Sequence, residues 1–358
     1  MTQAAVDDVV ETWEDAPAAV RTPLLVLEPL TKMLERTGVA RGRPQIERLG
    51  GGLSNATFLL RFDDGRDLVL RRPPRAPGHP SAHNVVREAR ILTALAETSV
   101  PVPRVLAVCD DPEVIGAPFY VMEHVDGHVP LAHLPEMFES PYERRKVGEA
   151  IVDALAAVHT VDLAASGLDQ LGRARGYLAR QLRRHLVLWE HYQTRDLPEV
   201  PYVADWLRRE LPDEGEVTLV HGDFHPANVV LSADAPARVV AVLDWELATR
   251  GDPLADVGYL TSLWHEDGDP SHPFERGPVT RGEGALTRKD ILERYAATSG
   301  RSIEGHGWYE VLALWRAVIF TEGNYRRGVA DGSPSLSGYG EFVPYLAELA
   351  VARMEALR

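Results

Sequence analysis

The sequence predicts an α+β protein with two lobes, a small N-terminal lobe built on an antiparallel sheet and a larger, mainly helical C-terminal lobe. The chain has 358 residues, which favours two lobes at roughly 150 residues per domain. β-rich runs separated by turn residues dominate the first third, whereas helical periodicity dominates after Gly127. We therefore expect a leader and helix over 1–44, an N-lobe over 45–124 and a C-lobe over 125–358.

Composition and charge limit the classes of function. Hydrophobic residues make up 45% of the chain and charged residues 25%, as in ordinary folded proteins. The formal net charge of -15 disfavours nucleic acid and anionic membrane surfaces as partners. Cys109 is the single cysteine, so no intrachain disulfide and no cysteine-based metal site can form. The acidic N-terminus does not resemble a signal peptide, and no run of 18 apolar residues follows, which predicts a cytoplasmic protein.

The elements of the N-lobe follow from local patterns. Residues 1–20 show no amphipathic stripe and are expected to form a loose leader, whereas Leu27, Leu30 and Leu34 have helical spacing that Gly38 can end. The remaining patterns predict a hairpin of strands 56–62 and 68–71 around Asp64-Gly65, a helix over about 82–97, and strands 105–108 and 119–122.

The C-lobe pattern is helical with three short interruptions. Val147, Ile151, Leu155 and Val158 recur every three or four residues, which predicts a helix. The β-like runs 217–220, 229–231 and 239–243 frame the densest polar cluster in the chain.

That cluster begins with the run VHGDFHPANVV from Val220. Asp223 precedes Asn228 by five residues, which is the spacing of the kinase catalytic loop. Asp223 could accept a proton from an attacking hydroxyl, and the carbonyl oxygen of Asn228 could hold Mg²⁺. The alternative is a turn in which both side chains bond nearby backbone. His225 could approach a substrate or be a packed turn residue.

Asp244 follows the run 239–243, where kinases place the metal-binding aspartate of Asp-Phe-Gly. Trp245 and Glu246 depart from that triplet, and an aspartate at the end of a strand can also be a turn former. Asp252 and Asp256 are expected near the start of a helix, where carboxylates cap free amides and could brace the catalytic loop.

The N-lobe supplies candidate nucleotide-binding residues. Gly51, Gly52, Ser54 and Asn55 lie in a segment between strands that could approach a phosphate, although a plain hairpin turn is the alternative. Arg71 occupies the position of the phosphate-contacting lysine of kinases, with Arg72 as a rival and an exposed strand end as the alternative. Glu88 on the next helix could pair with Arg71 or face solvent, and the backbone around Glu123 and Val125 could bind adenine.

These motifs resemble the aminoglycoside phosphotransferase family of small-molecule kinases, through HGDFHPAN at 221–228 and LDWELATRGDPLAD at 243–256. Within that family, four runs resemble the kinase-like domain of acyl-CoA dehydrogenase family members 10 and 11 more than they resemble the antibiotic-modifying members. They are GGLSNATFLLRF, SAHNVVREARIL, GAPFYVMEHVDG and RGYLARQLRRHLVLWE. The resemblance implies a bilobal protein-kinase-like fold, ATP as donor, Mg²⁺ as metal, and the roles given above for Asp223, Asn228 and Asp244. The related domains are associated with phosphorylation of hydroxyacyl-CoA.

The resulting hypothesis is an ATP-dependent phosphotransferase that acts on a hydroxyl of a small molecule, which could be a CoA thioester. Aminoglycoside or macrolide kinases are the alternative, and a nucleotide-binding pseudokinase is an alternative of another class because Arg71 replaces a lysine. A protein kinase is disfavoured because no Ala-Pro-Glu-like element follows Asp256. A basic segment of the chain would attract the phosphates of CoA. The alternative is that this segment is only an exposed basic helix face. It comprises Arg173, Arg175, Arg180, Arg183, Arg184 and His185.

Overall fold

The computed structural model describes residues 8–16, 22–50, 55–75, 84–130, 133–173, 175–213, 215–269 and 280–358. The chain divides into two compact units, of which the first is Met1–Asp126 with Leu243–Glu246 and the second is Gly127–Val242 with Leu247–Arg358. The segment Leu243–Glu246 thus belongs with the N-terminal unit although it follows most of the chain. The lobe boundary placed at residue 124 from the sequence stays a prediction.

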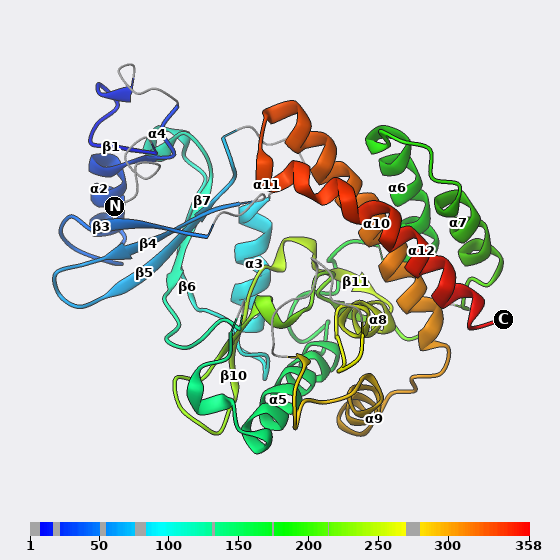
Figure 1. Ribbon diagram of the computed structural model, residues 1–358. Coiled ribbons are helices and arrows are strands. Elements are labelled where there is room, and N and C mark those ends of the chain that lie inside the picture. The colour runs from blue at the N-terminus through cyan, green and yellow to red at the C-terminus, as the bar shows by residue number, and fades with distance from the viewer. Residues whose placement is uncertain are drawn as a thin grey trace. The chain divides into compact units, whose positions relative to one another are not determined.

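The first unit is built on a five-stranded antiparallel sheet (Figure 1). The strand order is β3-β4-β5-β7-β6. The antiparallel pairing of β4 with β5 and the tight turn at Asp64-Gly65, where Gly65 has φ 85°, define a hairpin. The strand implied before the glycine-rich segment had no predicted residue range, and it is β3 in the structure. The strands are β3 (Gln45–Leu49), β4 (Ala56–Arg61), β5 (Asp67–Arg72), β6 (Val105–Cys109) and β7 (Phe119–Glu123).

Helices α2 and α3 form separate packing contacts in this unit. α2 (Leu27–Arg36) buries Leu30 and Leu34 in a core with Phe58, Leu60 and Leu70. α3 (Val85–Leu95) begins at Asn84, whose side chain accepts from the N–H of Arg87 at 2.9 Å, and it packs on β6 and β7. The short α4 (Pro112–Ile115) packs against α2.

The expectation of a loose leader is wrong for residues 8–16. β1 (Val9–Val10) pairs in parallel with β2 (Leu25–Val26). Asp8 is buried and ion-paired with Arg48, at 2.5 Å, and with Arg75. The two arginines lie far from Asp8 in the sequence, so local periodicity could not reveal this pairing.

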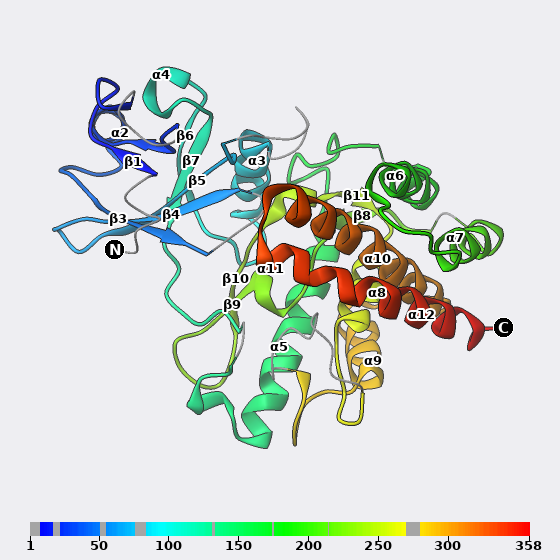
Figure 2. The same ribbon diagram turned by 45° about the horizontal axis from the view of Figure 1, so that its top comes forward.

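α10 (His306–Asp331) is the helix around which much of the second unit packs. α10 contacts α8, α12, α6 and α7, and Figure 2 shows α6 and α7 side by side. The other helices are α5 (Pro141–His159), α6 (Tyr177–Tyr192), α7 (Glu199–Arg209), α8 (Leu254–Ser262), α9 (Arg288–Ser299), α11 (Pro334–Ser337) and α12 (Phe342–Glu355). In the described residues, no helix is both long and apolar enough to cross a lipid bilayer.

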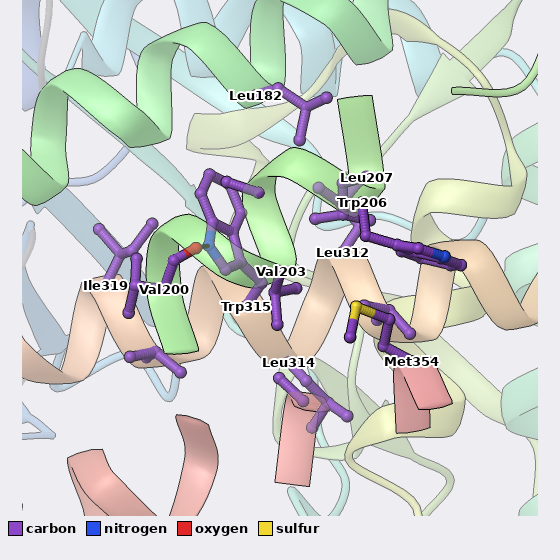
Figure 3. Packing of buried hydrophobic residues seen from close by; sticks show 14 of the residues in the cluster. Leu182, Val200, Val203, Trp206, Leu207, Leu312, Leu314, Trp315, Ile319 and Met354 are labelled. Atoms are coloured by element: carbon purple, nitrogen blue, oxygen red, sulfur yellow. Dashed lines mark hydrogen bonds between the residues drawn. The ribbon is translucent and has the colours of Figure 1, made fainter. Parts of the chain in front are cut away.

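Two tryptophans of α10 fix its packing against α7. The indole N–H of Trp315 donates to the carbonyl of Val200 at 3.0 Å, and that of Trp308 donates to Leu207 at 3.2 Å. Figure 3 shows Trp315 among Val200, Val203 and other apolar side chains of this core. Each indole therefore buries a large apolar surface while its polar atom stays hydrogen-bonded.

Two short antiparallel pairs hold the polar cluster of the second unit. β8 (Thr218–Val220) pairs with β11 (Thr249–Gly251), and β9 (Val229–Leu231) pairs with β10 (Val239–Val242). The loop 221–228 joins β8 to β9, so both of its ends are anchored in hydrogen-bonded strands.

Candidate active site

The loop 221–228 has a backbone conformation that depends on glycine. Gly222 has φ 87°, and a Cβ at this position would lie 3.0 Å from the Cβ and from the carbonyl oxygen of Leu247. The loop ends in a 3-10 turn, Pro226–Asn228. A side chain at position 222 would therefore be both strained and crowded, which explains the glycine directly before Asp223.

Asp256 on α8 braces this loop, as the sequence suggested. Its two carboxylate oxygens accept the N–H of His221 at 2.6 Å and of Gly222 at 2.8 Å. One of these oxygens also lies 3.2 Å from Nε2 of His159, whose Nδ1 contacts the hydroxyl of Tyr295 at 2.7 Å. Asp256, His159 and Tyr295 are all buried. The loop is thereby tied to α5, α8 and α9.

Asp256→Ala is expected to lower the free energy of unfolding by about 3–5 kcal/mol, because it leaves two buried N–H donors without an acceptor. Urea denaturation followed by circular dichroism measures the change. Asp331→Ala removes an exposed carboxylate from the same unit and is the control. A loss no larger than that of the control would show that Asp256 does not hold the loop.

Asp223 is held in its ionised form. The hydroxyl of Tyr259 donates to its Oδ1 at 2.7 Å, and Nε2 of His225 lies 3.6 Å from its Oδ2. Burial opposes ionisation, but hydrogen bonds from His225 and Tyr259 lower the pKa of Asp223 to about 2. The side chain keeps 31% of its exposure. It can therefore still meet a molecule from solvent as a carboxylate.

His225 is a packed turn residue rather than an exposed one. Its Nδ1 accepts the N–H of Ala227 at 3.2 Å, and the residue is 4% exposed. Since Nδ1 is an acceptor, Nε2 carries the proton and points its N–H toward Asp223. Tyr259 was not identified from the sequence, because its only signal is its position one helical turn after Asp256.

Asn228 is oriented by Asp223. Its Nδ2 donates to the backbone carbonyl of Asp223 at 2.9 Å and to its Oδ2 at 3.2 Å. These bonds fix the amide so that Oδ1 is left as a neutral oxygen ligand. An amide oxygen in this setting fits the hard oxygen donors that Mg²⁺ prefers.

Arg71, Glu88 and Asp244 form an ion-pair group in the first unit. Nε of Arg71 lies 3.1 Å from Glu88, and its Nη2 lies 2.7 Å from Oδ1 of Asp244. Burial opposes the charge of Arg71, but the carboxylates of Glu88 and Asp244 raise the pKa of its guanidinium. Burial raises the pKa of Glu88, and Arg71 counteracts that effect. The ion pair predicted between Arg71 and Glu88 is therefore present.

Arg72 lies on the opposite face of β5. Its guanidinium donates to the backbone carbonyls of Leu24 and Ile115, the latter at 3.0 Å, and it is 5% exposed. Side chains alternate between the faces of a strand, so only one of two adjacent arginines can face α3. Arg72 therefore has a structural role, which leaves the phosphate-binding prediction with Arg71.

Asp244 has an unusual backbone for a residue with a side chain. Its φ is 64°, and among the described residues it is the one non-glycine with positive φ. Such strain often accompanies a functional role. In the part of the chain that the structure describes, only Oδ1 of its carboxylate has a hydrogen-bond partner. A partly exposed carboxylate with one free oxygen fits the chemistry of a Mg²⁺ ligand.

Of the four residues predicted in the glycine-rich phosphate-binding segment, the structure describes only Asn55. Gly51, Gly52 and Ser54 lie outside the described residues. Asn55 is buried, and its Nδ2 donates to Oε2 of Glu246 at 3.0 Å. This bond attaches the start of β4 to the segment that carries Asp244. A direct nucleotide contact by Asn55 stays a prediction.

The chain after β7 offers free backbone groups. Glu123 uses its N–H to donate to Arg104 at 3.0 Å, and its Oε1 accepts the N–H of Arg104 at 3.1 Å. Within the described residues, neither the N–H nor the carbonyl of Val125 has a hydrogen-bond partner. Val125 can therefore still pair with a planar ligand, whereas the side chain of Glu123 serves the sheet.

The basic segment differs from the expectation at one residue. Arg183 and Arg184 on α6 are exposed, whereas His185 is 2% exposed. Burial and the charge of Arg316 lower the pKa of His185 to about 3, so the ring is neutral near pH 7. His185 is thus no part of a positive surface. Arg180 donates to the backbone carbonyls of Arg173 and Arg175.

Comparisons with known proteins agree on one family. The model of the "Phosphotransferase enzyme family" matches residues 45–289. Acyl-CoA dehydrogenase family member 10 of Mus musculus is 35% identical over 86% of this chain and 29% of its own length. Aminoglycoside 3'-phosphotransferase of Streptomyces fradiae is 28% identical over 64% of this chain and 79% of its own. The chain spans less than half of the acyl-CoA dehydrogenase relatives.

A solved structure supports the same assignment. A putative aminoglycoside phosphotransferase from Ralstonia eutropha has a TM-score of 0.77 and 31% identity, covering 92% of this chain and 98% of its own. The expected α+β, protein-kinase-like fold is therefore confirmed.

Proposed function

Because the chain belongs to the phosphotransferase enzyme family, we propose that it transfers the γ-phosphoryl group of ATP to a hydroxyl of a small molecule. The observation that carries this proposal is the ionised Asp223, held by Tyr259 and His225 in a loop anchored at both ends. A carboxylate so placed can accept a hydrogen bond from an acceptor hydroxyl and orient its oxygen for attack.

Asp223 acts mainly by orientation. A pKa of about 2 makes it a weak base, so the hydroxyl proton moves to its carboxylate only once attack has made that proton acidic. Tyr259 donates to Oδ1, whereas Asn228 and His225 both lie against Oδ2 at 3.2 and 3.6 Å. These partners limit rotation of the carboxylate, and Oδ1, with one donor, keeps a lone pair for the acceptor hydroxyl.

We propose the nucleotide-binding roles for the residues that the sequence singled out. Arg71, oriented by Glu88, contacts the phosphates, the segment containing Gly51, Gly52, Ser54 and Asn55 covers them, and the backbone from Glu123 to Val125 binds adenine. Asn228 and Asp244 hold Mg²⁺. When bound, that ion neutralises charge on the phosphates during transfer.

A nucleotide-binding pseudokinase is the candidate of another class, because Arg71 stands where kinases have a lysine. The ion pair with Glu88 shows that the arginine keeps the partner expected of that lysine. Mg²⁺-dependent ADP release that requires an acceptor supports the enzyme. Nucleotide binding without ADP release across a panel of acceptors would support the pseudokinase.

For the acceptor we propose a hydroxyacyl-CoA, with the antibiotic kinases as the alternative. The relatives named acyl-CoA dehydrogenase family members support this choice. The exposed Arg183 and Arg184 would attract CoA phosphates and repel a cationic aminoglycoside. We place this activity in the cytoplasm, on the single buried cysteine.

Arg183→Glu combined with Arg184→Glu is expected to raise the KM for a hydroxyacyl-CoA at least tenfold, about 1.4 kcal/mol of lost binding if KM follows affinity. Steady-state kinetics with a coupled ADP assay measures it. Arg208→Glu with Arg209→Glu reverses the same charge on exposed residues of α7 and is the control. Robust phosphorylation of kanamycin without turnover of any CoA thioester would exclude this substrate but not the kinase reaction.

A further inference from the structure

α10 carries a buried arginine to the catalytic loop. Arg316 is 7% exposed, and its Nη2 lies 3.4 Å from the carbonyl oxygen of Gly222, directly before Asp223. Its guanidinium carbon lies 5.9 Å from the ring centroid of Tyr259, whose hydroxyl is bonded to Asp223. Arg316 is therefore a neighbour of the residues that hold Asp223.

The charge of Arg316 is not matched by an acid. In the part of the chain that the structure describes, the guanidinium contacts only the carbonyl of Gly222 and the ring of Tyr259, and its buried Nε has no hydrogen-bond partner. The bond to Gly222 is long and the tyrosine face is a weak partner. Buried charges are normally paired, because an unpaired one has lost its hydration without compensation. An acceptor oxygen of another molecule would compensate the charge of Arg316.

His185 on α6 is a second buried polar residue, and α6 packs against α10. Its ring centroid lies 6.2 Å from that of Trp315, the neighbour of Arg316 on α10. Nδ1 contacts the carbonyl of Gln181 at 2.7 Å, so it carries the proton, and the buried Nε2 is an acceptor without a partner. An unpaired donor on Arg316 and an unpaired acceptor on His185 therefore lie on facing helices.

We propose that Arg316 is a specificity residue that binds a carbonyl or carboxylate oxygen of the acceptor, a few bonds from the hydroxyl that Asp223 orients, with His185 accepting from a bound O–H beside it. This inference rests on the proposed function. It restricts the acceptor to hydroxy acids and their thioesters. Simple alcohols and amino sugars offer only hydroxyl oxygens, which compensate a buried guanidinium less well than a carboxylate does.

Three acceptors that differ at one end test the proposal: butane-1,4-diol, 4-hydroxybutyrate and 4-hydroxybutyryl-CoA. The wild-type protein should prefer the last two by kcat/KM over the diol. Arg316→Gln should reduce this preference at least tenfold, and Arg316→Lys should retain part of it because it keeps the charge. Comparing 4-hydroxybutyrate with 4-hydroxybutyryl-CoA shows whether Arg316 binds a carboxylate or a thioester carbonyl oxygen. The acceptor whose oxygen Arg316 binds should show the larger loss of kcat/KM in Arg316→Gln.

Arg301→Gln is the matched control, because Arg301 also has a buried unpaired Nε but is ion-paired with Glu216 at 2.9 Å. It should leave the preference unchanged. Thermal melting checks that each variant is folded, and Arg316→Lys carries the test if Arg316→Gln is not. An equal loss on all three acceptors, including the diol, would overturn the proposal, because Arg316 would then only support the loop.

Calorimetry separates the two proposals. Binding of 4-hydroxybutyrate or 4-hydroxybutyryl-CoA that weakens in Arg316→Gln supports the site even if no phosphoryl transfer is found, in which case the proposed function alone fails. Transfer to these acceptors with the same affinity in wild type and in Arg316→Gln would reject the site and leave the proposed function intact.

Discussion

Asp223→Asn is expected to lower turnover by about 10² to 10⁴ while affinity for ATP stays within a few fold. The amide has nearly the same shape, so Tyr259 can still donate to its oxygen. It cannot take a proton, and its NH₂ group would turn toward His225 or toward the acceptor hydroxyl. The loss therefore affects the chemical step rather than nucleotide binding.

Single-turnover transfer of labelled phosphate, alongside calorimetric ATP binding, measures the two quantities separately. Asp234→Asn changes an exposed aspartate in the turn between β9 and β10 and should leave both unchanged. Tyr259→Phe should lose less than Asp223→Asn, because it removes one of the bonds that hold the carboxylate. Turnover of Asp223→Asn near that of wild type would remove Asp223 from catalysis.

Asp244→Ala is expected to abolish the strengthening of ATP binding by Mg²⁺. Asp244 supplies a carboxylate oxygen that has no other partner among the described residues, on a backbone held at φ 64°. Without it the ion has lost its charged ligand on the protein. Arg71 stays ion-paired with Glu88 in this variant, so metal-free ATP binding should change little.

Titration calorimetry with and without Mg²⁺ tests this expectation. Asp63→Ala removes an exposed carboxylate from the same unit and should preserve the metal effect. Asp244→Asn keeps an acceptor for Arg71 and should still lose most of the metal effect. If Mg²⁺ strengthened ATP binding to Asp244→Ala as it does for wild type, the metal ligands would lie elsewhere.

The sequence by itself determined many of the elements and the family resemblance. The β-rich runs 56–62 and 68–71 on either side of Asp64-Gly65 predicted β4 and β5, and the spacing of Val147, Ile151 and Leu155 predicted the middle of α5. The interval between Asp223 and Asn228 indicated a kinase loop, which the family match supports. These features depend on residues a few positions apart, so periodicity and spacing record them directly.

Only the tertiary structure decided which side chains meet. Arg71 and Arg72 are adjacent and chemically identical, and the packing of α3 against the sheet separates their roles. His185 belongs to a basic segment of the sequence, but burial lowers the pKa of its ring, so the side chain is neutral near pH 7. Arg316 lies 93 positions after Asp223, and no local pattern connects them. Burial and charge pairing depend on elements that are distant in the chain, so they become visible only when the helices are packed.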